Sequence, residues 1–258
     1  MIFNKQQKGL GDGSDSSMSL LQHLAELRKR LVISAVAVTV AAILGYVVYP
    51  HILNFLLHPL CAAEPANHCA LFVTSPLDGF ALRIKVSTYS GLFFASPIVP
   101  FQIWRFIAPG LKKSEKRYSV AFVTASMVLF SLGGAVAYIS FPHALRFLQG
   151  AAGTLVHPIY TPQSYLSLLM ALMAAFGAAF EFPVVLVSLE LLGVVTPQRL
   201  SKSRRWAIVS IFAAAAIFIP SSDPFSLFAL ALPLVLFYEV AILIGRILQK
   251  RTARPLAN

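Results

Sequence analysis

The sequence predicts an all-α integral membrane protein with six transmembrane helices of unequal length, and three observations lead to this prediction. Of the 258 residues, 57% are apolar and only 12% are charged, whereas soluble domains have about 45–50% and about 25%. A soluble fold could not cover so much apolar surface. Six runs of the chain are apolar enough to cross a bilayer, and most Lys and Arg residues lie on one side of these runs.

The first apolar run, residues 31–49, follows a polar arm that ends in Arg28, Lys29 and Arg30. A cleaved signal peptide has a shorter apolar core, of about 7–15 residues, followed by small residues at a cleavage site. The residues before Pro50 offer no such site. We therefore interpret this run as an uncleaved helix.

The other five apolar runs differ in length, and several contain prolines or charges: 80–107, 120–141, 165–192, 206–219 and 225–245. Runs 80–107 and 165–192 would form helices of about 42 Å, longer than the roughly 30 Å hydrocarbon core. They must tilt, break or project. Run 206–219 reaches only about 21 Å and requires local thinning of the bilayer or cover by protein. Unequal helices with internal prolines indicate a concave body.

The distribution of charge predicts the orientation. A net charge of +11 would suggest a nucleic-acid partner in a soluble protein, but in a membrane protein the positions of the cations matter more. All Lys and Arg residues except Arg83, Lys85 and Arg146 lie on the side that holds both termini. The positive-inside rule therefore places both termini in the cytoplasm, which agrees with an even number of spans. We predict no nucleic-acid partner.

Composition also divides the chain into three parts. Residues 1–18 are rich in Gly and Ser and are predicted to form a disordered cytoplasmic tail. Residues 19–247 form the six-helix membrane domain, and residues 248–258 form a basic cytoplasmic tail.

The motifs of common enzymes are missing from the sequence, which has no phosphate-binding loop, zinc-binding HExxH pair or GxSxG nucleophile elbow. We therefore expect no enzymatic activity and no metal site. Residues 50–75, which follow the first run, are interpreted as a loop on the outer side. Cys61 and Cys69 lie in this loop, where oxidising conditions favour a disulfide. The alternative is two free thiols, because this spacing has no metal-site specificity without further ligands.

Two of the few acidic residues lie on the inner side. Glu26 stands four residues before Arg30, a spacing that allows a weak helical ion pair. It faces away from an apolar stripe formed by Leu20, Leu24, Leu27 and Leu31. Glu115 lies within a basic loop and can serve as a solvated residue there. By spacing alone, these plain interpretations are favoured for both glutamates.

The carboxylates inside the apolar runs are more informative. An ionised carboxylate near the bilayer centre costs several kcal/mol, so Glu181 must be paired, protonated or turned toward a polar cavity. Its neighbour Pro183 cannot complete the helical hydrogen-bond ladder, which predicts a kinked, polar site. Glu190 and Glu239 lie nearer the inner ends, where interfacial packing or pairing is less costly. Asp223 precedes Pro224 in a tight outer turn, where Asp is a common turn residue.

Four stretches of the chain together resemble TatC, the six-helix core subunit of the twin-arginine protein translocase: Gln22–Leu31, Ser96–Leu111, Lys113–Arg117 and Tyr165–Pro183. The resemblance runs over about residues 19–247. It implies a cup-shaped body without a cofactor in the bacterial cytoplasmic membrane. It also implies a receptor for twin-arginine signal peptides that exports folded proteins using the proton motive force.

The same resemblance assigns roles to individual residues. Glu26 and Glu115 match the two cytoplasmic carboxylates that recognise the signal, with Arg28 in a supporting role. Two guanidinium groups match carboxylates bidentately, which lysines cannot do. Glu181 matches the intramembrane glutamate linked to the single-span partners TatA and TatB, and other copies of the chain are expected partners within the lipid bilayer. Pro59 matches a proline of the first outer loop. The other candidate positions of the chain are the intramembrane polar residues Asp223 and Glu239 and the structural prolines Pro97 and Pro183.

The outer turn departs from the family pattern, because Ile219 and Leu227 occupy positions where the family often has polar residues. This leaves the partner contacts around Asp223 open. An alternative function is a proton-coupled small-solute transporter that uses Glu181 and Glu239 as a relay. Against it, the sequence shows no internal repeat of the kind that transporters use.

Overall fold

The computed structural model describes residues 20–63, 71–107, 119–151, 153, 160–221 and 223–252. Within these ranges the regular secondary structure is entirely helical, as predicted. The helices follow the order α1 Leu20–Val47, α2 Tyr49–Ala63, α3 Asp78–Phe94, α4 Ile98–Ile107, α5 Ser119–Ala151, α6 Pro162–Phe180, α7 Phe182–Leu191, α8 Pro197–Lys202, α9 Arg204–Phe218 and α10 Pro224–Thr252.

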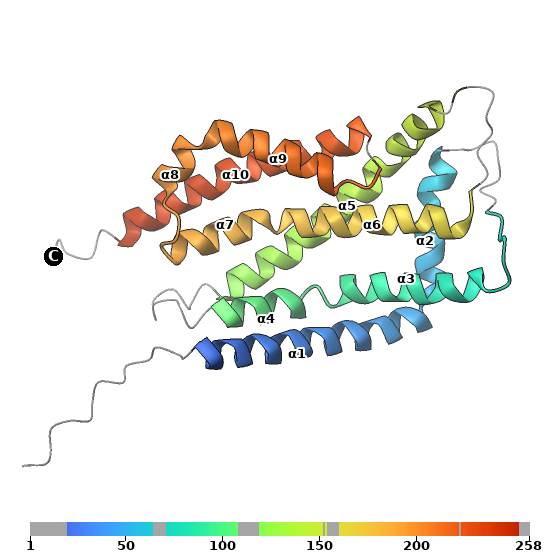
Figure 1. Ribbon diagram of the computed structural model, residues 1–258, viewed down its shortest axis with the longest axis horizontal. Coiled ribbons are helices and arrows are strands. Elements are labelled where there is room, and N and C mark those ends of the chain that lie inside the picture. Colours follow the sequence, from blue (N-terminus) through green and yellow to red (C-terminus); the bar gives the residue numbers. More distant parts are fainter. Residues whose placement is uncertain are drawn as a thin grey trace, which may run out of the picture.

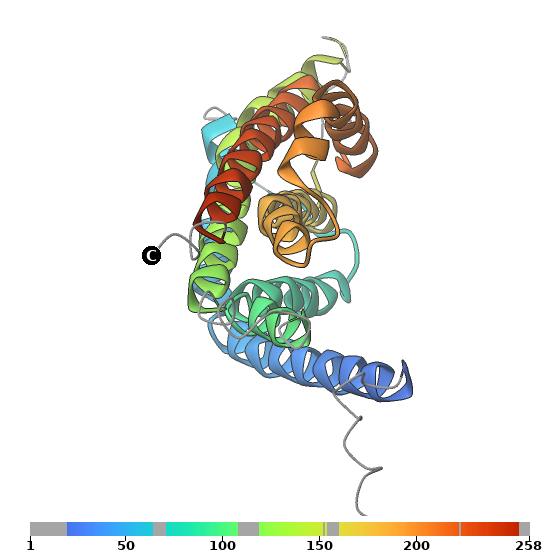
Figure 2. The same cartoon turned by 90° about the vertical axis from the view of Figure 1, so that its left-hand side faces the viewer.

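The helices form a curved wall with one helical rod inside the curve. Helix α1 packs against α3 and α4, α5 packs against α6, and α10 contacts α5, α7, α8 and α9 (Figure 1). Seen along its length, the molecule bends from α1 through α3 and α4 to α5 and α10, and ends at α8 and α9 (Figure 2). The rod formed by α6 and α7 lies within this bend. This arrangement agrees with the concave body that the unequal helices indicate.

The first helix begins earlier than the first apolar run. Helix α1 has 28 residues and includes the arm that carries Glu26 and Arg30. The apolar stripe on the arm is exposed: Leu24 is 60% and Leu31 67% accessible. Lipid chains are as apolar as Leu, so the apolar side of this helix does not have to face protein, and the polar side is free to pack against α4.

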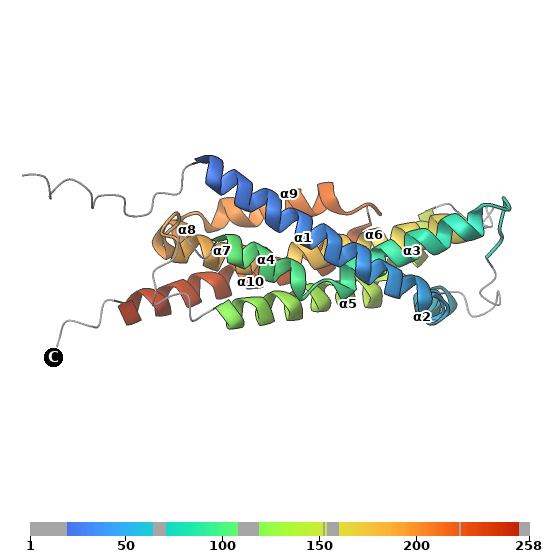
Figure 3. The same ribbon diagram turned by 90° about the horizontal axis from the view of Figure 1, so that it is seen from below.

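Residues 49–63 form α2, a helix in part of the segment predicted as a loop. It lies at the end of the molecule opposite the described C-terminal end of α10 (Figure 3). Its side chains Leu56, Leu60 and Pro59 are buried, and Tyr165 of α6 donates a hydrogen bond to the Leu56 carbonyl at 3.1 Å. Burial of one apolar side stabilises this helix although it contains a proline.

Both over-long runs are broken rather than straight. The run 80–107 divides into α3 and α4 at Ala95 to Pro97, and the run 165–192 divides into α6 and α7 at Glu181. Pro97 lies within the first break, and Pro183 follows the second by two residues. A proline ring cannot complete the preceding turn of a helix, which explains both breaks. The sequence predicted that these runs tilt, break or project, and the structure shows a break in each.

Four helical stretches are long and apolar enough to cross a membrane among the described residues: Leu24–Val47, Val120–Ala151, Pro162–Leu191 and Pro224–Gln249. The predicted second span falls outside this set because its two pieces, α3 and α4, have only 17 and 10 residues, and the predicted fifth span because α9 has 15 residues. Helix α10 continues to Thr252, across the predicted boundary at residue 247. Six crossings and the three-part division of the chain remain predictions.

Glycines allow the closest approach of helices. A side chain on Gly133 of α5 would place its Cβ 2.5 Å from the Phe176 carbonyl oxygen of α6, and one on Gly91 of α3 would lie 2.7 Å from the Val38 carbonyl oxygen of α1. Small residues let backbones pack closely, which is how helices associate in lipid.

Candidate functional site

The two ends of the molecule differ in charge. The N-terminal end of α1, the C-terminal end of α4 and the start of α9 lie at the same end of the molecule as the described end of α10 (Figure 1). The described cations there include Arg28, Arg105, Arg199, Arg204 and Arg246. Arg83 and Lys85 lie on α3, near the opposite end. We call the first of these the basic end.

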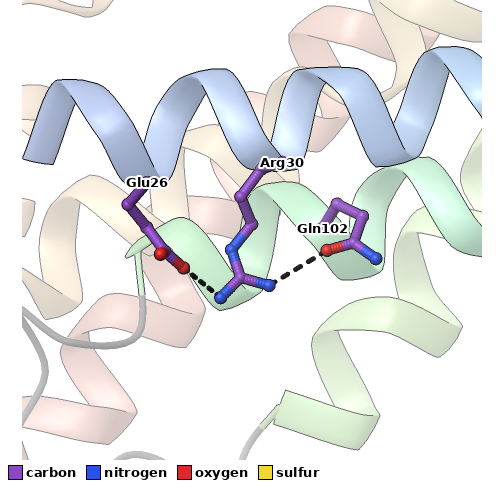
Figure 4. Close-up of polar contacts among 3 residues, drawn as sticks. All are labelled: Glu26, Arg30 and Gln102. Atoms are coloured by element: carbon purple, nitrogen blue, oxygen red, sulfur yellow. Dashed lines mark hydrogen bonds and ion pairs between the residues drawn. The ribbon is translucent and has the colours of Figure 1, made fainter.

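At the basic end, three polar side chains connect α1 with α4 (Figure 4). Arg30 Nη2 donates to Glu26 Oε1 one turn earlier on α1, and Arg30 Nη1 donates to Gln102 Oε1 of α4 at 3.0 Å. The Arg30 side chain is 15% exposed and that of Glu26 is 30% exposed. The predicted helical ion pair is therefore present, and the structure adds Gln102 as its anchor on a second helix.

This arrangement leaves the Glu26 carboxylate partly open to a ligand. A carboxylate has two oxygens and about four acceptor positions, and Arg30 binds Oε1. The planar guanidinium is held at both ends of its fork, which fixes the position of the carboxylate. The site can therefore accept a second donor, and a guanidinium matches it best.

The other residues predicted for this site are less defined. Arg28 is exposed on the same helix. Glu115 lies outside the described residues.

Trp104 of α4 lies near Gln102 in sequence and stacks on Phe122 of α5, with ring centroids 4.2 Å apart. This stack joins α4 to the start of α5.

Glu181 lies where α6 ends and α7 begins, between two apolar cavities. One cavity, of about 360 Å³, is bounded by α4, α5 and α7. The other, of about 560 Å³, is bounded by α6, α9 and α10. Ala178, Glu181 and Val185 line both. The carboxylate is next to Ser126 of α5, and Glu181 Oε1 is buried without a hydrogen-bond partner among the described residues. The predicted break of the helix at Glu181 is present, whereas the cavities on either side of it are apolar.

Asp223 has a structural role that the sequence indicated only as a turn. It is 1% exposed, and its Oδ1 accepts a hydrogen bond from the Ser226 backbone nitrogen at 2.7 Å while the Ser221 hydroxyl donates to Oδ2. These contacts cap the start of α10, with Pro224 in its first position. A role for Asp223 in partner contact remains a prediction.

The two glutamates nearer the basic end differ from each other. Glu239 pairs with Arg204 Nη2 at 2.8 Å, and both side chains are 45% exposed, as for a surface ion pair. Glu190 packs its carboxylate over Gly245 of α10, where a Cβ would lie 2.2 Å from Oε2. The surface pairing of Glu239 gives the relay of the transporter alternative no support.

The predicted structural residues lie in or beside helices. Pro59 is buried inside α2, Pro97 precedes α4, and Pro183 is buried in the first turn of α7. Cys61 also lies in α2, not in a loop, and it is disulfide-bonded. Cys69 lies outside the described residues, and its pairing with Cys61 remains a prediction.

Sequence reasoning missed the role of Gln102 and the bridge that Arg30 forms with it. Gln102 is 8% exposed and lies in an apolar stretch, where a buried amide has to find a partner. That signal was available, but the partner was not, since the two residues are 72 positions apart. Lys85 similarly donates to Ser167 Oγ of α6 at 2.7 Å. No group of three or more potential metal ligands occurs among the residues that the structure describes.

Comparison with known proteins places these features in a family. The family model described as Sec-independent protein translocase protein (TatC) matches residues 22–233. The Sec-independent protein translocase protein TatC of Frankia casuarinae is 37% identical over 250 residues, which cover 93% of this chain and 69% of the relative. The TatC protein of Aquifex aeolicus is 36% identical over 237 residues, covering 91% and 97%.

Solved structures agree with the sequence relatives. A crystal structure described as the twin-arginine translocase receptor TatC has a TM-score of 0.72 and 37% sequence identity. It covers 87% of this chain and 98% of the solved chain.

Proposed function

The chain belongs to the TatC family of Sec-independent protein translocases, and from this premise we propose that it binds twin-arginine signal peptides at its basic end. We assign the contact to Glu26 and Glu115, with Arg28 in a supporting role. The bound precursor is then exported in the folded state using the proton motive force. The proposal needs no cofactor and no enzymatic step.

The observation that carries this proposal is the anchored carboxylate of Glu26. The basic end is rich in cations, so it repels a ligand with two arginines unless carboxylates are placed to receive them. Glu26 is partly exposed there, and Arg30 and Gln102 hold it in place. Because Arg30 already occupies one of its oxygens, two guanidinium groups require a second carboxylate, and we assign this role to Glu115.

Binding of a signal peptide to the purified full-length protein tests the proposal. We expect Glu26→Gln or Glu115→Gln to weaken binding by roughly one to two decades, because a charge-assisted contact contributes about 1.5–3 kcal/mol. A twin-lysine peptide should bind the unmodified protein more weakly than a twin-arginine peptide. Glu190→Gln, which removes a carboxylate that packs on α10, serves as the matched control. Unchanged affinity in both variants would refute the assignment.

We further propose a multi-pass location in the bacterial cytoplasmic membrane with both termini in the cytoplasm. The charge difference between the two ends supports this orientation. The single-span TatA and TatB proteins and other copies of the chain are the proposed partners. The apolar cavities on either side of Glu181 are the proposed place for a partner helix. This helix should carry a hydrogen-bonding group, since a buried carboxylate oxygen without a partner is costly.

A further inference from the structure

The corner between α8 and α9 carries a dense group of cations that the proposed signal site does not use. Arg199 and Lys202 lie on α8, and Arg204 and Arg205 begin α9. All four side chains belong to exposed residues. We call these residues, together with Trp206, the α8–α9 corner.

Carboxylates offset only part of this charge. Arg204 is paired with Glu239. Glu190, the next carboxylate on the packed helices, lies over Gly245 instead of reaching the corner. Arg246 of α10 adds a further cation beside α8 by donating to Ser201 Oγ at 3.0 Å. Among the described residues, the corner therefore keeps a clear excess of positive charge.

The corner is held firmly against α10. The Tyr238 hydroxyl donates to the Leu200 carbonyl at 2.7 Å, and Gln198 donates to Gln249 at 2.9 Å. Pro197 is buried under the first turn of α8. The cations therefore lie on helices that are hydrogen-bonded to α10.

The side chains next to the cations are those of a membrane interface. Trp206 is 77% exposed and directly follows Arg205, whereas the other tryptophan of the chain, Trp104, is 5% exposed. Tryptophan is enriched where headgroups meet hydrocarbon. Helix α9 then continues with exposed apolar residues such as Val209 and Ile217. With 15 residues, it is about 22 Å long, shorter than the roughly 30 Å hydrocarbon core.

We propose that the α8–α9 corner binds the phosphate headgroups of anionic phospholipids in the leaflet at the basic end. Clusters of four or more cations at the cytoplasmic end of a membrane helix attract anionic lipids. Here Arg199, Lys202 and Arg205 supply the free charges, and Trp206 marks the depth of the headgroups. By holding headgroups at the start of a short helix, the site stabilises a locally thinned bilayer around α9. The inference rests on the proposed orientation but not on signal binding.

The two tryptophans allow a direct test. In Trp104→Phe protein, Trp206 is the only tryptophan and reports which lipid lies beside it. The full chain is reconstituted into bilayers with increasing amounts of brominated phosphatidylglycerol or brominated phosphatidylcholine, and quenching of Trp206 fluorescence is measured. We expect the anionic lipid to be favoured over phosphatidylcholine beside Trp206 by at least about fivefold, which corresponds to the attraction of one cation to an anionic surface. High salt should reduce this preference.

Two variants make the test specific. The triple variant Arg199→Gln, Lys202→Gln, Arg205→Gln should lose most of the preference. The matched control Lys5→Gln, Lys8→Gln, Arg254→Gln removes the same charge from the terminal segments and should keep it. If the triple variant does not insert, Arg205→Gln alone and the salt dependence of the Trp104→Phe protein replace it. Equal quenching by the two lipids, or a preference that survives loss of the corner cations, overturns the proposal. Signal-peptide binding measured on the same samples shows separately whether the receptor function holds.

Discussion

At the scale of single residues, the proposed signal site depends on an arginine that belongs to the protein itself. Arg30 is largely buried, and it contacts a carboxylate on its own helix and an amide on another. Because Gln102 holds Arg30 in place, Arg30 restricts the Glu26 carboxylate before any ligand arrives, which lowers the ordering cost of binding. Arg30 is therefore a positioning residue in the proposed function, and Glu26 is the residue that contacts the ligand.

We predict that Arg30→Gln weakens signal-peptide binding by about 1–2 kcal/mol, because Glu26 loses the group that orients it. In a Glu26→Gln background the same change should have little further effect, since the two residues act as one unit. Binding constants for the four proteins of this cycle give the coupling. Lys29→Gln, which removes an exposed charge from the same helix, is the control. Additive effects would mean that Arg30 acts independently of Glu26.

Glu181 is the second residue whose surroundings give a clear expectation. We predict that Glu181→Ala keeps signal binding, loses much of the transport and shows less crosslinking to single-span partners from positions next to Phe180 and Pro183. Interhelical polar contacts in membranes average about 0.6 kcal/mol, with a maximum near 2, so the complex should weaken without dissociating. Val185→Ala, which alters the walls of the same two cavities, controls for their shape. Normal export and crosslinking in Glu181→Ala would make the glutamate a tolerated polar residue.

At the scale of the elements, the fold is held by breaks and close contacts in long helices. The breaks at Ala95 and Glu181 turn two runs that are too long for a bilayer into four shorter helices. Close packing at glycine then fixes α5 against α6. Because lipid offers no hydrophobic driving force between helices, such contacts contribute a large share of the association energy.

We predict that Gly133→Ala destabilises the protein by about 1–3 kcal/mol, because the new methyl group would overlap the backbone of Phe176. Gly150→Ala lies on the same helix with no atom within 4 Å of its Cβ, and it should be neutral or stabilise by up to about 1 kcal/mol. Thermal unfolding of the two variants in detergent measures the difference. Equal transition temperatures would show that α5 and α6 adjust freely.

At the scale of the whole molecule, charge and shape act together. The helices form a curved wall around the rod of α6 and α7 (Figure 2). Described cations gather at the basic end, and Glu181 on the rod lies between the two cavities. The proposed signal site at the basic end and the proposed partner site at Glu181 are thus separate places in the structure. This separation is why changes at Glu26 and at Glu181 are expected to affect different steps.

The predicted orientation can be checked with single cysteines. In a Cys61→Ser, Cys69→Ser background, we expect Val194→Cys to react with a membrane-impermeant thiol reagent only from the cytoplasmic side, and Leu77→Cys only from the outer side. Both side chains are well exposed, at 61% and 73%, so access and not burial decides the outcome. Labelling of both positions from the same side would contradict the predicted arrangement of the spans.

Much of this protein is determined locally, and the sequence alone is enough to predict it. Hydrophobic runs depend only on composition over about twenty residues, and prolines break helices through their own ring geometry. The all-helical membrane fold and the kink at Glu181 were predicted for these reasons, and the two long runs were predicted to tilt, break or project. Glu26 as a signal-binding residue came from the resemblance of its segment to a family.

Other features depend on which helices lie next to one another, and only the tertiary structure decided them. Sequence reasoning assigned no role to Gln102, because its partner Arg30 is 72 positions away and reaches it only through the packing of α4 on α1. Residues 49–63 were interpreted as a loop, although Leu53, Leu56 and Leu60 recur at helical spacing. The helix contains Pro59, and contact with α3 and α5 stabilises it. Asp223 makes its capping contacts within three residues of its own position, but its burial depends on the packing around it. Periodicity and charge report what a segment prefers by itself, whereas the partner of a buried polar group is chosen by long-range packing.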